Sequence, residues 1–430
     1  PPFCAAMPLC LKRNNMHHTM RRSSDCLLAA SRKACNSLQR LCLALFCLAV
    51  AGCEREPVLN LHQGGTDIGT VVPNVDLDLH VVWNYLFKYD VEYDWQAEWL
   101  YGWDDTDRSL FGPIGYTEPQ AFDVRRYFTG PVPCGPHTSP YSHTISGHYL
   151  RARYDFGYWD ILAWNTINAP DGVQSVRIDE QSTYDHVTAY TGETMNTAPY
   201  AAPRFPHSFY QPEELFAGYE QGLEINRNLD GFVFDEERNC WVRQLEMQLQ
   251  PVTYIYLVQV VLRHNNRSGR KVTAIDGNAN LSGMARSVNL NTGITGTDAV
   301  TVNFFMRMKH DLTDRAGETV DIIGGKTLTF GLPKLNPSRL NTRNYLESLE
   351  KVREADLNNR HYLDVKMQFY NGKDSTFVFD VTDQVRRLFR GGVITVELDM
   401  DKVPVPNRSG GSGFDAVVED FEEKQWEFDM

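Results

Sequence analysis

The stretch VDLDLHVVW, residues 75–83, decides the fold class of this chain of 430 residues. Apolar side chains occupy every second position, and Asp76, Asp78 and His80 stand between them. Because successive side chains of a β-strand point to opposite faces, this period of two predicts a strand with one buried face and one solvated face.

Further strands are expected on both sides of this one. Residues 158–164 follow Gly157, and residues 252–262 are apolar at both sets of alternate positions, which predicts a central strand. Residues 362–370 and 375–381 flank Asn371-Gly372, a strong hairpin signal. Shorter strands are expected at 173–178, 302–308, 393–398 and 327–332, the last following a turn at Gly324-Gly325.

Helices are expected to be few and short. Residues 343–355 are amphipathic, residues 384–389 follow a cap at Thr382-Asp383, and residues 211–216 resemble one turn with a proline near its start. Residues 90–115 and 130–148 are expected to be long loops. Many strands joined by turns predict an all-β protein.

The chain beyond residue 52 is long enough for two hydrophobic cores, and prolines are frequent between residues 182 and 212. We therefore expect two tandem β-sandwich domains, at 73–210 and 211–430.

Residues 1–52 differ in composition from the rest. They hold seven Lys/Arg and one acid, Asp25, and end in the apolar run LCLALFCLAV before Ala51-Gly52-Cys53. This order is typical of a signal peptide, and the run is too short to span a bilayer. Because residue 1 is proline rather than methionine, the sequence is expected either to carry an N-terminal extension ahead of the signal or to be a fragment. Residues 53–72 would then form a tether.

The remaining composition limits the class of partner. Without residues 1–52 the formal charge would change from −13 to −19, because that segment carries seven positive charges and one negative. So acidic a chain is a poor candidate for binding nucleic acid. Beyond Cys53 only Cys134 and Cys240 remain, either as one disulfide or as two separate buried thiols.

Taken in order, these features resemble the fimbrillin-like lipoproteins of the Bacteroidales: the major fimbrial subunits, their anchor and accessory proteins, and related domains of unknown function. The stretches that carry the resemblance are VAGC ending at Cys53, VDLDLHVVWN, FGYWDILAWN, LQPVTYIYLVQVVL, LSGMARSVNL, FVFDVTDQV, GGVITVELD and GGSGFDAVVEDF. The resemblance implies two transthyretin-like β-sandwich domains, acylation of Cys53, location at the outer membrane facing the surroundings, and a part in fimbriae or adhesion. It also implies fimbrial subunits as partners, bound by strand donation.

Stalk subunits of that family are cut after an arginine a few tens of residues beyond the lipid. Here the next arginine after Arg55 is Arg108, and Lys88 is the only lysine between them, which favours a subunit that keeps its lipid. At the other end, residues 414–418 and 426–430 alternate as a donor strand would. An ordinary final strand or an acidic tail is the alternative.

Motifs for catalysis are missing: HExxH, GxSxG and CxxC do not occur. His137, His143 and His148 are read as loop histidines, and the residues near Asp104 lack the glutamate of a calcium loop. We expect no catalytic residue, metal or cofactor. An exported hydrolase with an acid pair is the third alternative.

The best remaining feature is a cluster of aromatics between residues 83 and 103, above all Trp95, Trp99 and Trp103. Exposed, they would stack on sugar rings; buried, they would be core. The sequence therefore predicts a non-enzymatic fimbrial anchor or accessory lipoprotein, with a surface glycan-binding (polysaccharide-binding) lipoprotein as the alternative.

Overall fold

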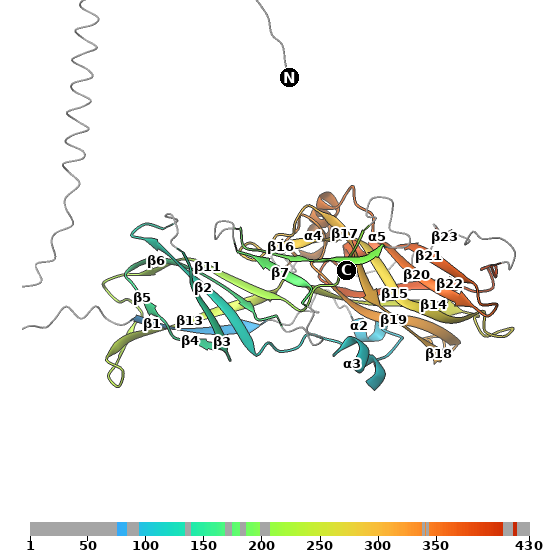
Figure 1. The fold of residues 1–430 in the computed structure, drawn as a ribbon, viewed down its shortest axis with the longest axis horizontal. Coiled ribbons are helices and arrows are strands. Elements are labelled where there is room, and N and C mark those ends of the chain that lie inside the picture. The colour runs from blue at the N-terminus through green and yellow to red at the C-terminus, as the bar shows by residue number, and fades with distance from the viewer. Residues whose placement is uncertain are drawn as a thin grey trace, which may run out of the picture. The chain divides into compact units, whose positions relative to one another are not determined.

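Strands dominate the computed structural model, which describes residues 75–83, 94–133, 139–167, 174–180, 186–197, 207–337, 340, 344–406 and 416–418. All of these belong to the unit Pro73–Met430. The described residues contain four short helices, α2 (Trp95–Glu98), α3 (Asp105–Phe111), α4 (Tyr345–Ala355) and α5 (Thr382–Arg387) (Figure 1). The predicted all-β class is confirmed.

The first sheet starts with its edge strand β3 (Tyr141–Ser146) and continues through strands that lie far apart in the sequence. The order is β3, β2 (Ala121–Gly130), β6 (Gly157–Asn165), β11 (Phe216–Ile225), β13 (Cys240–Pro251), β1 (Val75–Trp83) and β4 (Tyr149–Leu150); β12 (Val233–Asp235) pairs with β13, and β5 (Arg153–Tyr154) pairs with β1. Leu77 of β1 and Phe122 of β2 are both fully buried in one apolar cluster, so the two parts of this sheet share a core.

Two further sheets face each other. The larger has the order β23 (Ala416–Val418), β21 (Asp374–Asp380), β20 (Tyr362–Phe369), β15 (Val272–Ala285), β17 (Ala299–Phe305), β10 (His207–Tyr210) and β9 (Glu193–Thr197). The smaller, here called the central sheet, consists of β18 (Arg307–Thr313), β19 (Thr319–Thr329), β14 (Tyr254–Arg263) and β22 (Gly392–Asp399). A small fourth sheet joins β16 (Ser287–Asn289), β8 (Thr188–Thr191) and β7 (Val176–Asp179).

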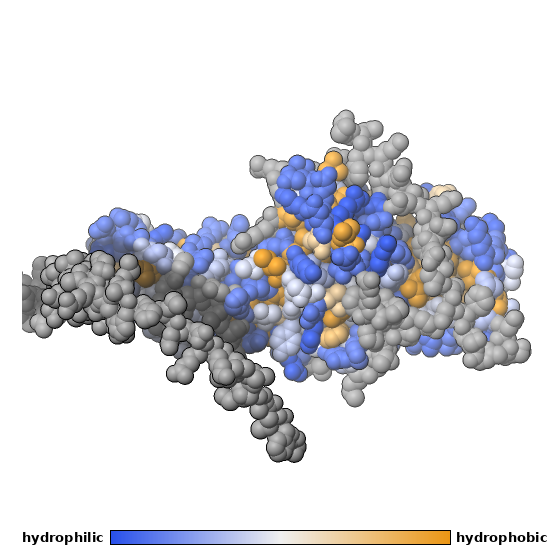
Figure 2. Space-filling model, turned by 90° about the horizontal axis from the view of Figure 1, so that it is seen from above, coloured by the Kyte–Doolittle hydropathy of each residue, from blue (hydrophilic) through white to orange (hydrophobic). Residues whose placement is uncertain are grey.

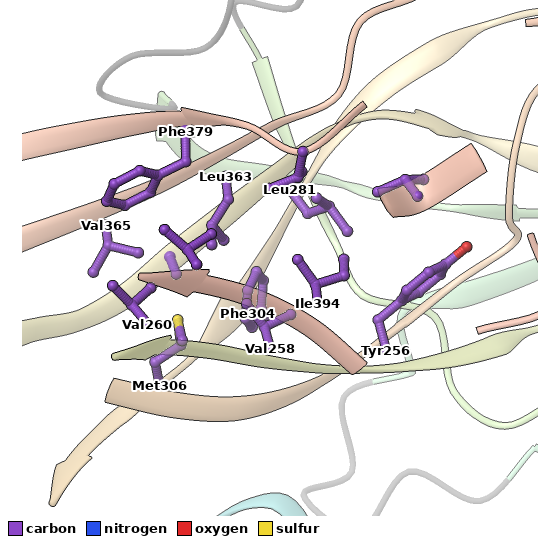
Figure 3. Packing of buried hydrophobic residues seen from close by; sticks show 14 of the residues in the cluster. Tyr256, Val258, Val260, Leu281, Phe304, Met306, Leu363, Val365, Phe379 and Ile394 are labelled. Carbon is purple, nitrogen blue, oxygen red and sulfur yellow. The ribbon is translucent and has the colours of Figure 1, made fainter. Parts of the chain in front are cut away.

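The core between the two facing sheets is apolar. Val258 and Val260 of β14 point toward Leu363 and Val365 of β20, with Phe304 of β17 between them (Figure 3). Every β14 residue from Tyr254 to Leu262 is buried, because the opposite face of the central sheet is covered as well. The prediction of a central strand here is confirmed, and burial on both faces explains why its apolar residues do not alternate.

Other local predictions have mixed outcomes. The hairpin at Asn371-Gly372 is confirmed, with Gly372 at a φ of 74°, and so is the helix 343–355, as α4. The helix predicted at 384–389 begins earlier, at Thr382, and ends at Arg387. The helical turn predicted at 211–216 is wrong: Phe216 begins strand β11, and Glu213 accepts hydrogen bonds from Ser175.

The turn predicted at Gly324-Gly325 is also wrong, because β19 runs through both residues without interruption. The expected loop 90–115 contains α2 and α3, and the expected loop 130–148 contains β3.

The division into domains at residue 210 stays a prediction. Strands from both sides of that position are hydrogen-bonded to each other, since β11 pairs with β6 and β13 pairs with β1.

Candidate functional site

The first described strand, β1, is an internal strand of its sheet. It pairs in parallel with β13 over nine residue pairs, from Val75 opposite Trp241 to Trp83 opposite Leu249. Its other edge pairs with the short strands β5 and β4. Leu77 on this strand is fully buried, so β1 contributes to the core as well as to the hydrogen bonding of the sheet. Removing it would expose the edge of β13 and part of the core.

The tether and its cysteine precede this strand. Cys53, residues 1–52 and the tether 53–72 lie outside the described residues, and acylation of Cys53 stays a prediction. A fully extended chain from Cys53 to Val75 would span at most about 75 Å, at roughly 3.4 Å per residue.

Residues 94–116, here called the covering segment, lie across the central sheet, on the face opposite to the one that packs against the larger sheet (Figure 1). Gln259, fully buried in the middle of β14, holds the segment by three hydrogen bonds. Its Oε1 accepts from the backbone N–H of Leu100 at 2.9 Å and of Tyr101 at 3.2 Å, and its Nε2 donates to Glu98 O at 2.8 Å. A buried amide that satisfies three backbone groups fixes the register of the segment on the strand.

The cap of α3 supplies a second attachment. Asp107 is fully buried and accepts from the hydroxyl of Tyr101 at 3.0 Å. Two cations of β18 reach the same carboxylate, Arg307 at 2.9 Å and Lys309 at 2.5 Å. The ammonium of Lys309 also lies 4.0 Å from the ring centroid of Tyr101. The buried charge of Asp107 is therefore paired and hydrogen-bonded, as a buried carboxylate has to be.

A third attachment is Lys326 of β19. Its Nζ donates to Pro113 O at 2.8 Å and Gly115 O at 3.2 Å and lies 3.3 Å from Glu214. Burial lowers the pKa of Lys326, whereas Glu214 opposes that effect. The covering segment is thus fixed to the central sheet at both ends and in the middle.

The three tryptophans predicted to bind glycan belong to this covering segment. Trp99 is 8% exposed, and its indole Nε1 donates to Gly102 O at 2.9 Å. Trp103 is half-buried against Phe111, with ring centroids 5.4 Å apart, and Trp95 packs against the same apolar cluster. Of the two alternatives, glycan stacking and core packing, the burial of Trp99 fits core packing. Glycan stacking by Trp95 and Trp103 stays a prediction.

Cys240 is buried at the start of β13, but Cys134 lies outside the described residues, so the proposed disulfide stays a prediction. Of the three loop histidines, His137 also lies outside, whereas His143 is in β3 and half-buried. Burial, and then the positive charges of Arg126 and Arg125, lower the pKa of His143.

His264, Asp399 and Asp401 form a cluster that the sequence did not suggest, with potential ligand atoms within 4.8 Å of one another. Asp399 already accepts from His264 at 2.9 Å and Asp401 pairs with Arg267 at 2.9 Å. Since both carboxylates already have side-chain partners, we assign no metal to this cluster.

The surface of the described residues is mixed in polarity. Figure 2 shows one face on which hydrophilic residues predominate and apolar residues form small patches. Among the described residues, no helix is both long enough and apolar enough to cross a membrane.

One cluster on the first sheet was also missed by the sequence. Arg126 of β2 is 4% exposed and lies among the rings of Tyr141, Tyr154 and Trp159, within 5.5 Å of each ring centroid. The alternation of β2 places Arg126 on the same face as the buried Phe122 and Val124, but the rings around it come from β3, β5 and β6, so the sequence alone does not bring the cluster together.

Comparison with known proteins gives structural neighbours only: no protein-family model matches the chain, and no curated protein matches it significantly. A putative adhesin from Bacteroides ovatus is 14% identical, with 80% of this chain and 100% of that chain covered and a TM-score of 0.44.

Two further neighbours have other descriptions. The fimbrial anchor protein Mfa2 from Porphyromonas gingivalis is 12% identical (75% and 90% covered, TM-score 0.36). A putative polysaccharide binding protein from Bacteroides thetaiotaomicron is 11% identical (75% and 91% covered, TM-score 0.35). At these identities and TM-scores, any argument for function has to rest on the residues of this chain.

Proposed function

We propose that this chain is an exported surface protein, held at the outer membrane by a lipid on Cys53, that acts without catalysis as a fimbrial anchor or accessory subunit in adhesion. The observation that carries the proposal is the position of β1. This strand is internal to its sheet, and Lys88 is the only lysine or arginine between Arg55 and Arg108.

Retention of β1 separates an anchor from a stalk. A subunit that loses its first strand leaves an open edge, which a neighbour's extended segment can fill. In this chain β1 already fills that place, and no arginine lies between Arg55 and β1 at which it could be released. A protein that keeps both the lipid and its first strand suits the base or the side of a fimbria better than the stalk.

The far edge of the larger facing sheet is the best candidate for contact with a subunit. There β23 pairs in parallel with β21, Ala416 opposite Phe377 and Val418 opposite Phe379. Within this chain, residues 416–418 are the last strand that the structure describes, and residues 426–430 lie outside the described part. We propose that a donor strand from a fimbrial subunit occupies this edge in place of β23.

The test is intact-mass analysis of the membrane fraction, comparing the wild type with Cys53→Ala and with Cys47→Ala as the matched control. Acylation at Cys53 predicts a mature species that begins at Cys53 with two or three acyl chains, lost in Cys53→Ala and unchanged in Cys47→Ala. A soluble, unlipidated product from the wild type would refute the anchor and favour a secreted protein. If the wild type is lipidated at Cys53, copurification of fimbrial subunits with it would identify the partner.

A surface glycan-binding lipoprotein remains the second candidate. The observation that favours it is Tyr141, which is 50% exposed on the edge strand β3 beside a buried cation. Aromatic rings of this kind provide a flat apolar surface with a polar edge, as sugar recognition requires.

A further inference from the structure

Arg126 faces the interior of the first sheet's core. Its strand neighbours on the same face, Phe122 and Val124, are fully buried, and Arg126 itself is 4% exposed. Its Nη1 donates to Arg153 O at 2.8 Å, and its Nε and Nη2 both lie near His143 Nε2, at 3.2 and 2.9 Å. The positive charge is therefore enclosed by neutral groups.

Three aromatic rings complete the enclosure. The guanidinium carbon lies 4.6 Å from the ring centroid of Tyr154, 5.3 Å from Tyr141 and 5.5 Å from Trp159. Within the described part of the chain, no carboxylate lies within ion-pair distance of Arg126. Its neighbour Arg125, on the opposite face of the strand, has Glu180 at 2.6 Å.

A buried guanidinium without a carboxylate is incompletely compensated. Removing a charge from water is costly, and contacts with aromatic rings offset only part of this cost. The planar guanidinium has five N–H donors and matches a carboxylate in a bidentate arrangement. Each terminal nitrogen of the guanidinium carries two N–H groups, of which the hydrogen bonds to Arg153 and His143 use one. The site is thus prepared for an anion.

Tyr141 lies between the guanidinium of Arg126 and the solvent at the edge of the sheet. It lies directly opposite Arg126 in the β2–β3 register, on the outermost strand of the sheet, and half of its surface is exposed. Its ring centroid is 5.8 Å from that of Trp159. Rotation of an exposed side chain is fast, so Tyr141 can turn outward, expose the guanidinium and offer its ring to a ligand.

We propose that Arg126 and Tyr141 form a binding site for a carboxylate-bearing sugar, a uronic or sialic acid. The carboxylate pairs with the guanidinium of Arg126, and the apolar face of the sugar ring packs on Tyr141. This site goes beyond the anchor role and does not depend on the lipid at Cys53. Its failure would leave the anchor proposal intact.

The probes are glucuronate and N-acetylneuraminate, titrated into the purified protein and followed by tryptophan fluorescence, since Trp159 adjoins Arg126, and by calorimetry. Glucose, which lacks the carboxylate, and acetate, which lacks the sugar ring, are the comparison ligands. We expect saturable binding of at least one acidic sugar, at least about tenfold weaker binding of glucose and acetate, and weakening by salt.

The variants separate this site from general effects. Tyr141→Ala and Arg126→Lys should each weaken binding by about tenfold or more, because one loses the stacking surface and the other the bidentate fork. The matched controls Tyr149→Ala, an exposed tyrosine on β4, and Arg125→Gln should stay within about twofold. Thermal unfolding shows whether each variant is folded.

Three results would overturn the proposal: no saturable binding of either acidic sugar, equal binding of acetate, or equal loss in Tyr149→Ala and Tyr141→Ala. If Arg126→Lys does not fold, Tyr141→Ala, altered at an exposed side chain, still decides the matter.

Discussion

The ring of Tyr101 lies against the backbone of Gly324, so close that a Cβ atom on Gly324 would be 2.4 Å from Tyr101 Cγ. Tyr101 is 1% exposed, and its hydroxyl and its backbone N–H are both hydrogen-bonded. The ring has no room to retreat. A glycine inside a strand often marks such a close approach, and here it lets the covering segment lie flat on the central sheet.

Gly324→Ala should therefore destabilise the protein by about 1–3 kcal/mol, because the added methyl group forces the Tyr101 ring and its segment outward. Urea unfolding measures the change, and tryptophan fluorescence should report the displacement of Trp99 and Trp103. Gly192→Ala is the matched control: a Cβ there would meet nothing closer than 3.8 Å, and its stability should be unchanged or slightly higher. Equal losses in the two variants would contradict the close approach of Tyr101.

Asp107→Asn should cost about 3 kcal/mol, because Lys309 and Arg307 would lose the buried charge that they share. Limited proteolysis should then cut the covering segment faster than in the wild type. Asp105→Asn, in the same helix, is the control: the side chain of Asp105 is 97% exposed and pairs only with Arg108 among the residues described, so less than about 1 kcal/mol is expected. A stable, protease-resistant Asp107→Asn would show that the three attachments are redundant.

Asp364 should make the protein less stable as the pH rises. It is 2% exposed, and neither carboxyl oxygen has a hydrogen-bond partner in the described structure. Burial raises the pKa of Asp364 to about 8. The folded state therefore holds this proton where the unfolded chain has lost it, and stability falls between about pH 4 and pH 8. Asp364→Asn should be more stable than the wild type at pH 8, and this advantage should disappear near pH 4. An advantage that does not vary with pH would refute the assignment.

Asp356 should show the opposite slope. It is fully buried after α4. Burial raises its pKa, but hydrogen bonds from His361 at 2.9 Å and Arg386 at 2.8 Å outweigh that effect and keep the pKa below its usual value. Its contribution to stability is present above the ordinary pKa of an aspartate and is lost as the pH falls below it. Asp356→Asn should be strongly destabilised at pH 7, and the difference from the wild type should shrink toward pH 3. Chemical unfolding at both pH values measures this.

The strands that could be predicted from the sequence are those whose burial follows a local period. Residues 75–83 alternate, 252–262 are apolar on both faces, and Asn371-Gly372 marks a hairpin; each pattern is complete within a dozen residues. The turn predicted at Gly324-Gly325 was wrong because these positions require glycine for lack of space, not for a turn. Tyr101 and Phe305 lie so close to the backbone there that a side chain would not fit.

The candidate sites were harder to predict for the same reason. The aromatics of residues 95–103 drew attention as a group, but burial of Trp99 depends on how Gln259 holds the neighbouring backbone. Arg126 resembles any polar interruption of an alternating strand. Only the packing of Tyr141, Tyr154 and Trp159 around it identifies a buried cation.

The parallel pairing of β1 with β13 has a mechanical consequence. A pull on the chain ahead of Val75 acts at the N-terminal end of β1, whereas β13 passes the load onward from its C-terminal end at Pro251. In a parallel pair these ends lie at opposite sides, so the two strands are drawn past each other along their length. All nine residue pairs then resist together rather than opening one after another, and the sheet should withstand a drag force far better than one whose strands are peeled apart.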